Sequence, residues 1–335
     1  MGQLATVSNS SVTSGHIPSL DGWRALAIVM VIITHFRFLV RCKGLGRHGV
    51  GVFFVLSGYL ITTVLMKEWE KNGHIDLRSF YIRRFFRLMP TAWTLLALYF
   101  LCHVIDLREL ASCVFFYRNY LSHVSTLATD HFWSLSIEEQ FYLVWPWILV
   151  FAGPRWARNV AIAGACLVAA YRFMNPTPDF VLQTQFHADA LFVGCFFALT
   201  SRLPRMPSVV FWLSALTVGA CAVGPFFFGP PFWDSILIGW MIHTTALGGI
   251  PLAQKVLNWQ PIATIGVMSY SLYIWQSPMS RFPLNTYVEV SVILVVLAAL
   301  TILTYTFIEN PSRRLGARIA ERLKRPVPTV VEAPV

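Results

Sequence analysis

Charged side chains are scarce in this sequence. Asp, Glu, Lys and Arg together make up 13% of its 335 residues, whereas hydrophobic residues make up 56%. A water-soluble domain carries roughly 25% charged residues, so this chain has too little polar surface to cover a soluble globule. The composition therefore excludes an ordinary soluble domain. It predicts an integral, multi-pass membrane protein.

Several motifs of soluble enzymes and pumps are also missing. The sequence contains no G-x-S-x-G motif, which leaves a serine-hydrolase mechanism without support. It contains no G-x-x-x-x-G-K motif, which argues against an ATP-driven pump. Its six cysteines stand singly, without a C-x-x-C pair, and this pattern gives no indication of zinc, haem or a redox couple. We therefore expect no metal ion, and we expect the cysteines to serve in packing.

Long apolar segments are abundant. A helix that crosses a bilayer needs about 20 mostly apolar residues, and this length predicts an all-α transmembrane helical bundle of about ten spans. The segment 108–124 is ambiguous, because it reads either as a re-entrant piece or as an eleventh span. The ten windows are approximately 21–40, 48–66, 88–106, 132–152, 156–171, 185–200, 208–228, 232–249, 262–280 and 287–308.

The basic residues lie in short segments between these windows and in the tail. The net charge of +10 would suit nucleic acid, but we expect no nucleic-acid partner because no soluble domain is predicted that could present a binding groove. The positive-inside rule accounts for the charge more simply. The densest Lys and Arg clusters lie in 67–87 and after Glu309, so both segments are predicted to face the cytoplasm. The basic segment from Arg37 to Arg47 conflicts with this orientation, since it would lie outside.

The positions of the apolar windows and of the basic residues divide the chain into three parts. Residues 1–18 are rich in Ser and Thr and are expected to form a flexible N-terminal segment. Residues 19–315 are expected to form one transmembrane domain, and residues 316–335 a basic cytoplasmic tail.

The first apolar window contains charged and titratable residues. Arg24 and His35 are eleven positions apart, which is about three helical turns, so both lie on one stripe about 16 Å apart. Asp21 joins this stripe three positions before Arg24. Ionisable groups inside a bilayer are costly and mark functional sites by default. The alternative for His35 is a hydrogen bond to a neighbouring helix near the interface.

Two further segments carry candidate site residues. The window that begins at 132 contains adjacent carboxylates, Glu138 and Glu139, which point about 100° apart on a helix. One can face a cavity, and a capping role at the helix start accounts for one of them better than both. In the segment 67–87, Arg83 and Arg87 share a helical face, with aromatic residues largely opposite, which is typical of an amphipathic helix at the membrane surface.

Seven segments, in this order over about 300 residues, resemble signatures of the acyltransferase-3 family, a family of multi-span membrane acyltransferases. Asp21-Gly-Trp-Arg24 followed by His35 resembles the D-G-x-R and R-x10-H motifs of that family. The remaining six segments are 49–61 (GVGVFFVLSGYLI), 83–90 (RRFFRLMP), 132–142 (FWSLSIEEQFY), 188–194 (ADALFVG), 269–275 (SYSLYIW) and 308–314 (IENPSRR).

The resemblance implies transfer of an acyl group, most often acetyl from acetyl-CoA, to a hydroxyl of a carbohydrate-containing acceptor. Acyl-CoA, the acceptor and the lipid bilayer are the implied partners, and a bacterial-type inner (plasma) membrane is the implied location. Arg83, Arg84 and Arg87 would bind the CoA phosphates, because guanidinium groups bind phosphate in a bidentate manner. His35 would be the general base, since imidazole titrates near neutrality. Arg24 and Glu139 would orient or charge-balance the site.

Other interpretations remain open. The chain could be a transporter or flippase that moves acyl groups or lipid-linked sugars without chemistry, with the intramembrane Arg and His lining the path. The aromatic-rich arginine segment could also serve only as a membrane anchor. A non-catalytic scaffold would leave the Arg24–His35 pair without a role.

Overall fold

The computed structural model describes residues 17–35, 43–121, 128–176, 182–200, 203–223, 232–279 and 287–324. Every regular element in these ranges is helical, which confirms the predicted all-α class. Most of the predicted N-terminal segment and the final residues of the predicted tail lie outside the described residues, as do Arg37 and Arg41.

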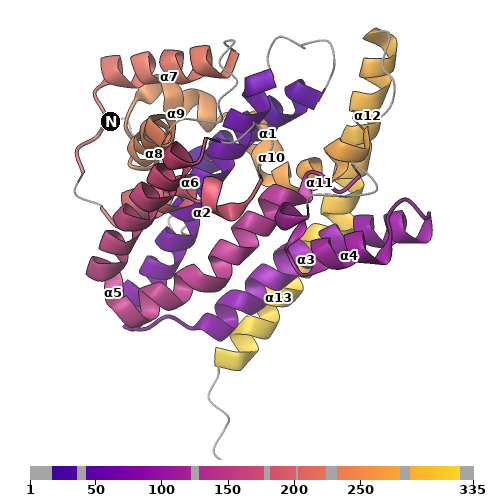
Figure 1. The fold of residues 1–335 in the computed structure, drawn as a ribbon, viewed down its shortest axis with the longest axis horizontal. Coiled ribbons are helices and arrows are strands. Elements are labelled where there is room, and N and C mark those ends of the chain that lie inside the picture. Colours follow the sequence, from indigo (N-terminus) through magenta and orange to yellow (C-terminus); the bar gives the residue numbers. More distant parts are fainter. Residues whose placement is uncertain are drawn as a thin grey trace, which may run out of the picture.

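Every predicted apolar window overlaps at least one helix among the described residues, and Figure 1 shows how these helices are arranged. Short 3-10 turns at Arg118–Tyr120 and Thr184–Phe186 lie between them, and a π-turn at Tyr305–Glu309 joins the last two. The helices are α1 (Pro18–His35), α2 (Lys43–Asn72), α3 (Leu77–Leu101), α4 (Leu107–Val114), α5 (Phe132–Met174), α6 (Asp189–Ala198), α7 (Ser208–Val223), α8 (Phe232–Ala246), α9 (Pro251–Leu257), α10 (Gln260–Val267), α11 (Ser269–Met279), α12 (Tyr287–Thr304) and α13 (Asn310–Lys324).

Two helical stretches among the described residues, Gly44–Asn72 and Val288–Leu323, are long and apolar enough to cross a membrane. The pair α8 and α9 would add a third span if it is counted as one unit despite its 87° bend. The predicted number of about ten spans is therefore not confirmed. One reason is that predicted windows fall on shorter or broken helices, as at Gly153 of α5, where φ is +72°.

The ambiguous segment 108–124 contains no spanning helix in its described part. Helix α4 has 8 residues, which corresponds to about 12 Å at 1.5 Å per residue. The hydrocarbon core of a bilayer is about 30 Å thick. Neither α4 nor the 3-10 turn after it is long enough to cross that distance.

Close contacts between α2 and α6 hold the centre of the bundle together. A Cβ atom added to Gly58 of α2 would lie 2.0 Å from the carbonyl oxygen of Leu191, and one added to Gly194 of α6 would lie 2.1 Å from that of Val55. Glycine lets two helix backbones approach this closely, as it does in membrane proteins generally. The packing of α2 is therefore fixed on the side that faces α6.

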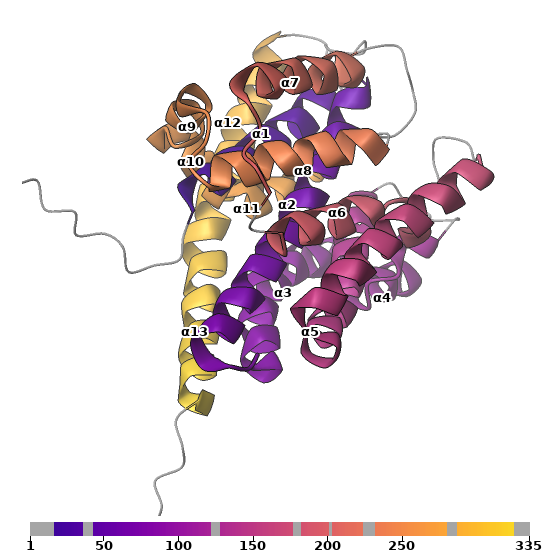
Figure 2. The same cartoon turned by 90° about the vertical axis from the view of Figure 1, so that its left-hand side faces the viewer.

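Helix α3 is continuous from Leu77 to Leu101, so the predicted amphipathic segment and the predicted third span form one helix. Asp76 caps its start by accepting a hydrogen bond from the amide of Ser79 at 3.1 Å. Helix α13 continues the column of α12 and lies along α3 (Figures 1 and 2). The hydroxyl of Ser79, which donates to the carboxylate of Asp76, lies 3.4 Å from the carbonyl oxygen of Ala320, so the end of α13 lies beside the start of α3.

Candidate functional site

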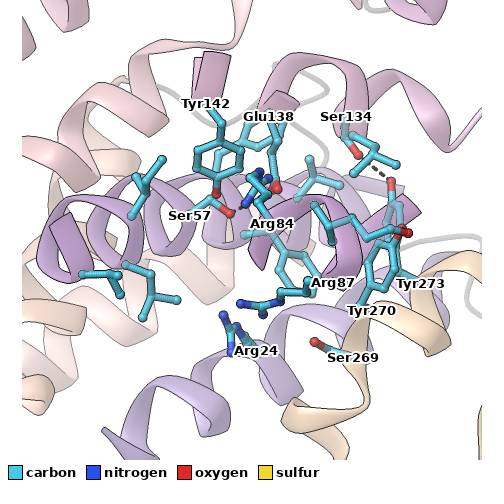
Figure 3. A pocket seen from close by; sticks show the side chains of 18 of the residues that line it. Arg24, Ser57, Arg84, Arg87, Ser134, Glu138, Tyr142, Ser269, Tyr270 and Tyr273 are labelled. Atoms are coloured by element: carbon cyan, nitrogen blue, oxygen red, sulfur yellow. Dashed lines mark hydrogen bonds between the residues drawn. The ribbon is translucent and has the colours of Figure 1, made fainter. Parts of the chain in front are cut away.

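A cavity of about 340 Å³ lies between α1, α2, α3, α5 and α11 (Figure 3). Its volume falls within the range of pockets that bind small molecules, roughly 300–1,000 Å³. Along α2, apolar side chains from Val50 to Val64 form one wall. The polar side chains in the lining are Arg24, Ser57, Arg83, Arg84, Arg87, Ser134, Glu138, Tyr142, Ser269, Tyr270 and Tyr273.

Three of the four arginines in the lining are paired with carboxylates that lie outside it. The Arg24 guanidinium is 3.0 Å from the carboxylate of Asp21, which lies three positions earlier in α1. The guanidinium of Arg83 is 3.5 Å from the carboxylate of Glu68, near the end of α2. These ion pairs hold the side chains in place without removing their charge from the cavity.

Arg84 is the most firmly held of the four. Its guanidinium makes a two-point contact with the carboxylate of Glu139, with Nε 3.2 Å from Oε2 and the second nitrogen on Oε1. Its terminal carbon also lies 3.3 Å from the centre of the Tyr142 ring. Because its guanidinium is engaged both at its edge and on one face, Arg84 has less capacity for a ligand than the sequence suggests.

Arg87 differs from the other three, because it forms no direct ion pair with any carboxylate among the described residues. Its guanidinium lies beside that of Arg24 (Figure 3). Burial, followed by repulsion from Arg24, Arg313 and Arg84, lowers the pKa of Arg87, which precedes the predicted span 88–106. A bound anion would relieve this repulsion, so Arg87 is the strongest candidate in the cavity for holding a phosphate.

The adjacent carboxylates of α5 have different surroundings. Glu139 lies against Arg84 and does not appear in the cavity lining. Glu138 lines the cavity, and its Oε1 accepts a hydrogen bond from the hydroxyl of Ser57 at 3.0 Å. Sequence reasoning selected Glu139 and missed Glu138 and Ser57. The neighbouring carboxylates were a signal that one faces a cavity, but their order on the helix gave no way to choose between them.

The structure places His35 apart from the cavity. It is the last residue of α1, its side chain is exposed, and its Nδ1 lies 2.7 Å from the carbonyl of Val31. Arg24 lines the cavity, but His35 does not. The structure therefore brings together Arg24, Arg83, Arg84 and Arg87 of the predicted site residues, with Glu139 behind Arg84, and leaves His35 at the end of its helix.

One wall of the cavity carries neutral hydroxyl groups. The hydroxyls of Ser134 and Tyr273 lie 2.6 Å apart (Figure 3), and Tyr273 also donates to the carbonyl of His131 at 2.8 Å. Tyr270 donates to the carbonyl of Leu88 at 2.7 Å. The cavity thus combines arginines with neutral hydrogen-bonding groups. In the described part of the chain, no group of three His, Cys, Asp or Glu side chains is placed to hold a metal ion.

Comparison with known proteins identifies the family of this chain. The profile of the acyltransferase-3 family, described as "Acyltransferase domain", matches residues 17–309. The chain belongs to this family. Five of the seven segments that resemble acyltransferase-3 signatures contribute side chains to the cavity, from Arg24 in the first to Tyr273 in the sixth. The parts of the sequence that carry the family resemblance therefore converge on one site.

Several relatives of this acyltransferase-3 chain carry functional names. Peptidoglycan O-acetyltransferase OatA of Listeria monocytogenes is 31% identical over 90% of this chain and 56% of its own length. Putative peptidoglycan O-acetyltransferase YrhL of Bacillus subtilis is 28% identical over 92% of this chain and 56% of its own length. O-acetyltransferase OatA of Staphylococcus aureus is 28% identical over 90% of this chain and 58% of its own length. The chain therefore spans just over half the length of these relatives. No solved structure matches it.

Proposed function

We propose that this domain transfers an acyl group, acetyl in the first instance, from acyl-CoA to a hydroxyl of a carbohydrate-containing acceptor. The observation that carries the proposal is the cavity itself. Five family signatures meet there, and four arginines, a carboxylate and several hydroxyls line it. The names of the relatives, which include peptidoglycan O-acetyltransferases, support acetyl as the transferred group and a glycan as the acceptor.

The arginines define the donor end of the cavity. A thioester donor such as acyl-CoA carries phosphates on its nucleotide and a long, mostly neutral pantetheine arm. Arg87 supplies a guanidinium that forms no direct ion pair among the described residues, and Arg24 lies beside it. Arg83, whose side chain is 35% exposed, extends this charge toward the rim. Arg84 contributes its charge while it remains bound to Glu139. The arm and the acyl group would then lie along the apolar wall of α2.

Orientation follows from the basic residues. The turn between α2 and α3 and the end of α13 lie at one end of the bundle, and the densest Lys and Arg clusters lie in these segments. By the positive-inside rule, this end is expected to face the cytoplasm. Acyl-CoA would enter there, because it is a cytoplasmic metabolite. The proposal includes the multi-pass arrangement in the inner membrane and a cytoplasmic C-terminus.

His35 is the sequence-based candidate for the base in this scheme. It lies about 16 Å from Arg24 along α1 at 1.5 Å per residue. At this distance, His35 can serve as the base only if the donor, with its phosphates on the arginines, places its thioester at the end of α1. Replacement of His35 by Gln tests that role, because Gln keeps a hydrogen bond but accepts no proton at neutral pH.

Two measurements test the proposed function. The first is release of the CoA thiol from acetyl-CoA by the purified protein in nanodiscs, with soluble peptidoglycan glycan strands as acceptor. The second is mass spectrometry of those strands for an added acetyl mass. A transporter or flippase would produce neither signal, and it would show no protection of the 83–87 segment by CoA.

A further inference from the structure

A carboxyl group faces the interior of the cavity and forms no direct ion pair with any of the lining arginines. It belongs to Glu138, and no other Asp or Glu side chain occurs in the cavity lining described by the structure. Asp21, Glu68 and Glu139, by contrast, each lie against one of the lining arginines from outside.

The Glu138 side chain is positioned by a hydrogen bond from the hydroxyl of Ser57. The hydroxyl of Tyr142 points toward Ser57 (Figure 3), and Ser57 donates to Oε1 of Glu138 at 3.0 Å. Figure 3 shows these three side chains pointing toward one another from α2 and α5. Among the described residues, no side chain other than Ser57 hydrogen-bonds to Glu138, so Oε2 is left for a ligand.

Glu138 meets the middle of the apolar α2 wall, along which we propose that the acyl arm lies. Its partner Ser57 lies midway along the α2 wall, seven positions from both Val50 and Val64. Seven helical residues span about 10 Å. Arg83, Arg84 and Arg87 lie on α3, together with Phe80 and Leu88. Arg84 and Arg24 lie close enough to Glu138 to act on it electrostatically, so a donor held by the arginines lies in the same cavity as the Glu138 carboxyl group.

We infer that Glu138 transfers the proton during acyl transfer in this cavity. The acceptor oxygen attacks the thioester carbonyl carbon, and its O–H proton passes to Oε2 of Glu138. The new C–O ester bond forms and the C–S bond breaks, so that sulfur leaves with the bonding electron pair. Glu138 then returns the proton to that sulfur, giving the ester and free CoA thiol. Ser57 is a positioning residue, because it holds the carboxyl group through Oε1. The inference rests on the proposed function and moves the proton-transfer role from His35 to Glu138.

A set of variants at adjacent positions tests this role. Glu138→Gln keeps the shape of the side chain and still accepts the Ser57 hydrogen bond, but it cannot take up a proton. Loss of a general base typically lowers the rate by about 10²–10⁴-fold, so kcat for CoA release from acetyl-CoA should fall by that factor while KM for acetyl-CoA changes little. Glu139→Gln is the matched control, because it removes the carboxylate behind Arg84. It should raise KM for acetyl-CoA more than it lowers kcat.

Chemical rescue separates catalysis from structure. Glu138→Ala opens space beside Ser57, and added formate supplies a small carboxylate there. CoA release should rise with formate concentration in Glu138→Ala, but not in Glu139→Ala. A merely structural role of Glu138 predicts no such recovery.

The outcomes distinguish this inference from the proposed function. An active parent protein whose Glu138→Gln variant keeps near-normal kcat, with His35→Gln inactive, would return the base role to His35 and overturn the inference alone. Failure of formate to restore any rate in a folded Glu138→Ala variant would overturn it as well. A parent protein that releases no CoA from acetyl-CoA with the glycan strands contradicts the proposed function and, with it, the inference.

Discussion

The arginine cluster makes a quantitative prediction about donor binding. Arg87 has no direct ion pair among the described residues, so no carboxylate there competes directly with a phosphate for its guanidinium. A hydrogen bond to a charged group contributes about 1.5–3 kcal/mol, and about 1.4 kcal/mol corresponds to tenfold in Kd. Arg87→Lys keeps the charge but loses the planar two-point contact. The Kd for CoA should therefore rise by about 10–100-fold.

Arg84→Lys is the matched comparison, because it should lower stability more, and CoA affinity less, than Arg87→Lys does. The Arg84 and Glu139 side chains are only 16% and 11% exposed, and lysine cannot reproduce either the two-point contact or the stacking on Tyr142. The free energy of unfolding should fall by about 1–2 kcal/mol, since one charged hydrogen bond is lost while the charge stays. The Kd for CoA should change less than in Arg87→Lys.

Titration calorimetry of the purified protein in nanodiscs measures both affinities, and a thermal melt followed by tryptophan fluorescence measures stability. Pantetheine, which lacks the phosphates, is the control ligand, and Arg87→Lys should not alter its binding. An unchanged CoA affinity in Arg87→Lys, or a larger loss in Arg84→Lys, would refute the assignment of Arg87 to the phosphates. Both arginines would then serve as structural or membrane-anchoring residues.

Three further predictions concern packing, orientation and metals. Gly58→Ala should lower the thermal stability, because its Cβ would meet the backbone of α6 at 2.0 Å and overpacking costs about 1–3 kcal/mol; Gly219→Ala, with nothing within 4 Å of the added atom, should not. Topology reporters at Gly73 and Lys324 should report the same, cytoplasmic side, since the adjoining helices touch at Ser79; opposite sides would contradict the arrangement. Dialysis against EDTA should leave CoA release unchanged, and a loss restored by added zinc would reveal a metal site.

The helical fold was predictable because hydropathy acts locally. Within the described residues, each of the ten windows overlaps a helix, since a long apolar run in a membrane satisfies its backbone hydrogen bonds by forming a helix. The number of spans was less predictable, because it depends on breaks between helices. At Gly153, two predicted windows lie on the two arms of α5, and the window 262–280 is divided between α10 and α11. Sequence hydropathy averages over such breaks.

The site was predictable in its arginines and less so in its acids and hydroxyls. Arg83, Arg84 and Arg87 were found because a cationic cluster directly before an apolar window is visible in the local sequence, and Arg24 because a charge inside a span is costly. The choice between Glu138 and Glu139 depends on the rotation of α5 against α3, which sets which carboxylate meets Arg84. That rotation is a tertiary property, and no local pattern encodes it.

The packing of α2 links the architecture of the bundle to the chemistry of the cavity. Ser57 and Gly58 are consecutive residues, so their side-chain directions differ by about 100° on the helix. Gly58 faces Leu191 of α6, where no additional atom fits, and Ser57 faces Glu138 of α5 at 3.0 Å. Any displacement of α2 away from α6 must therefore shift the Ser57 hydroxyl relative to the Glu138 carboxyl. The close approach of α2 and α6 thus fixes the geometry of the Ser57–Glu138 pair, although no residue of α6 reaches the cavity.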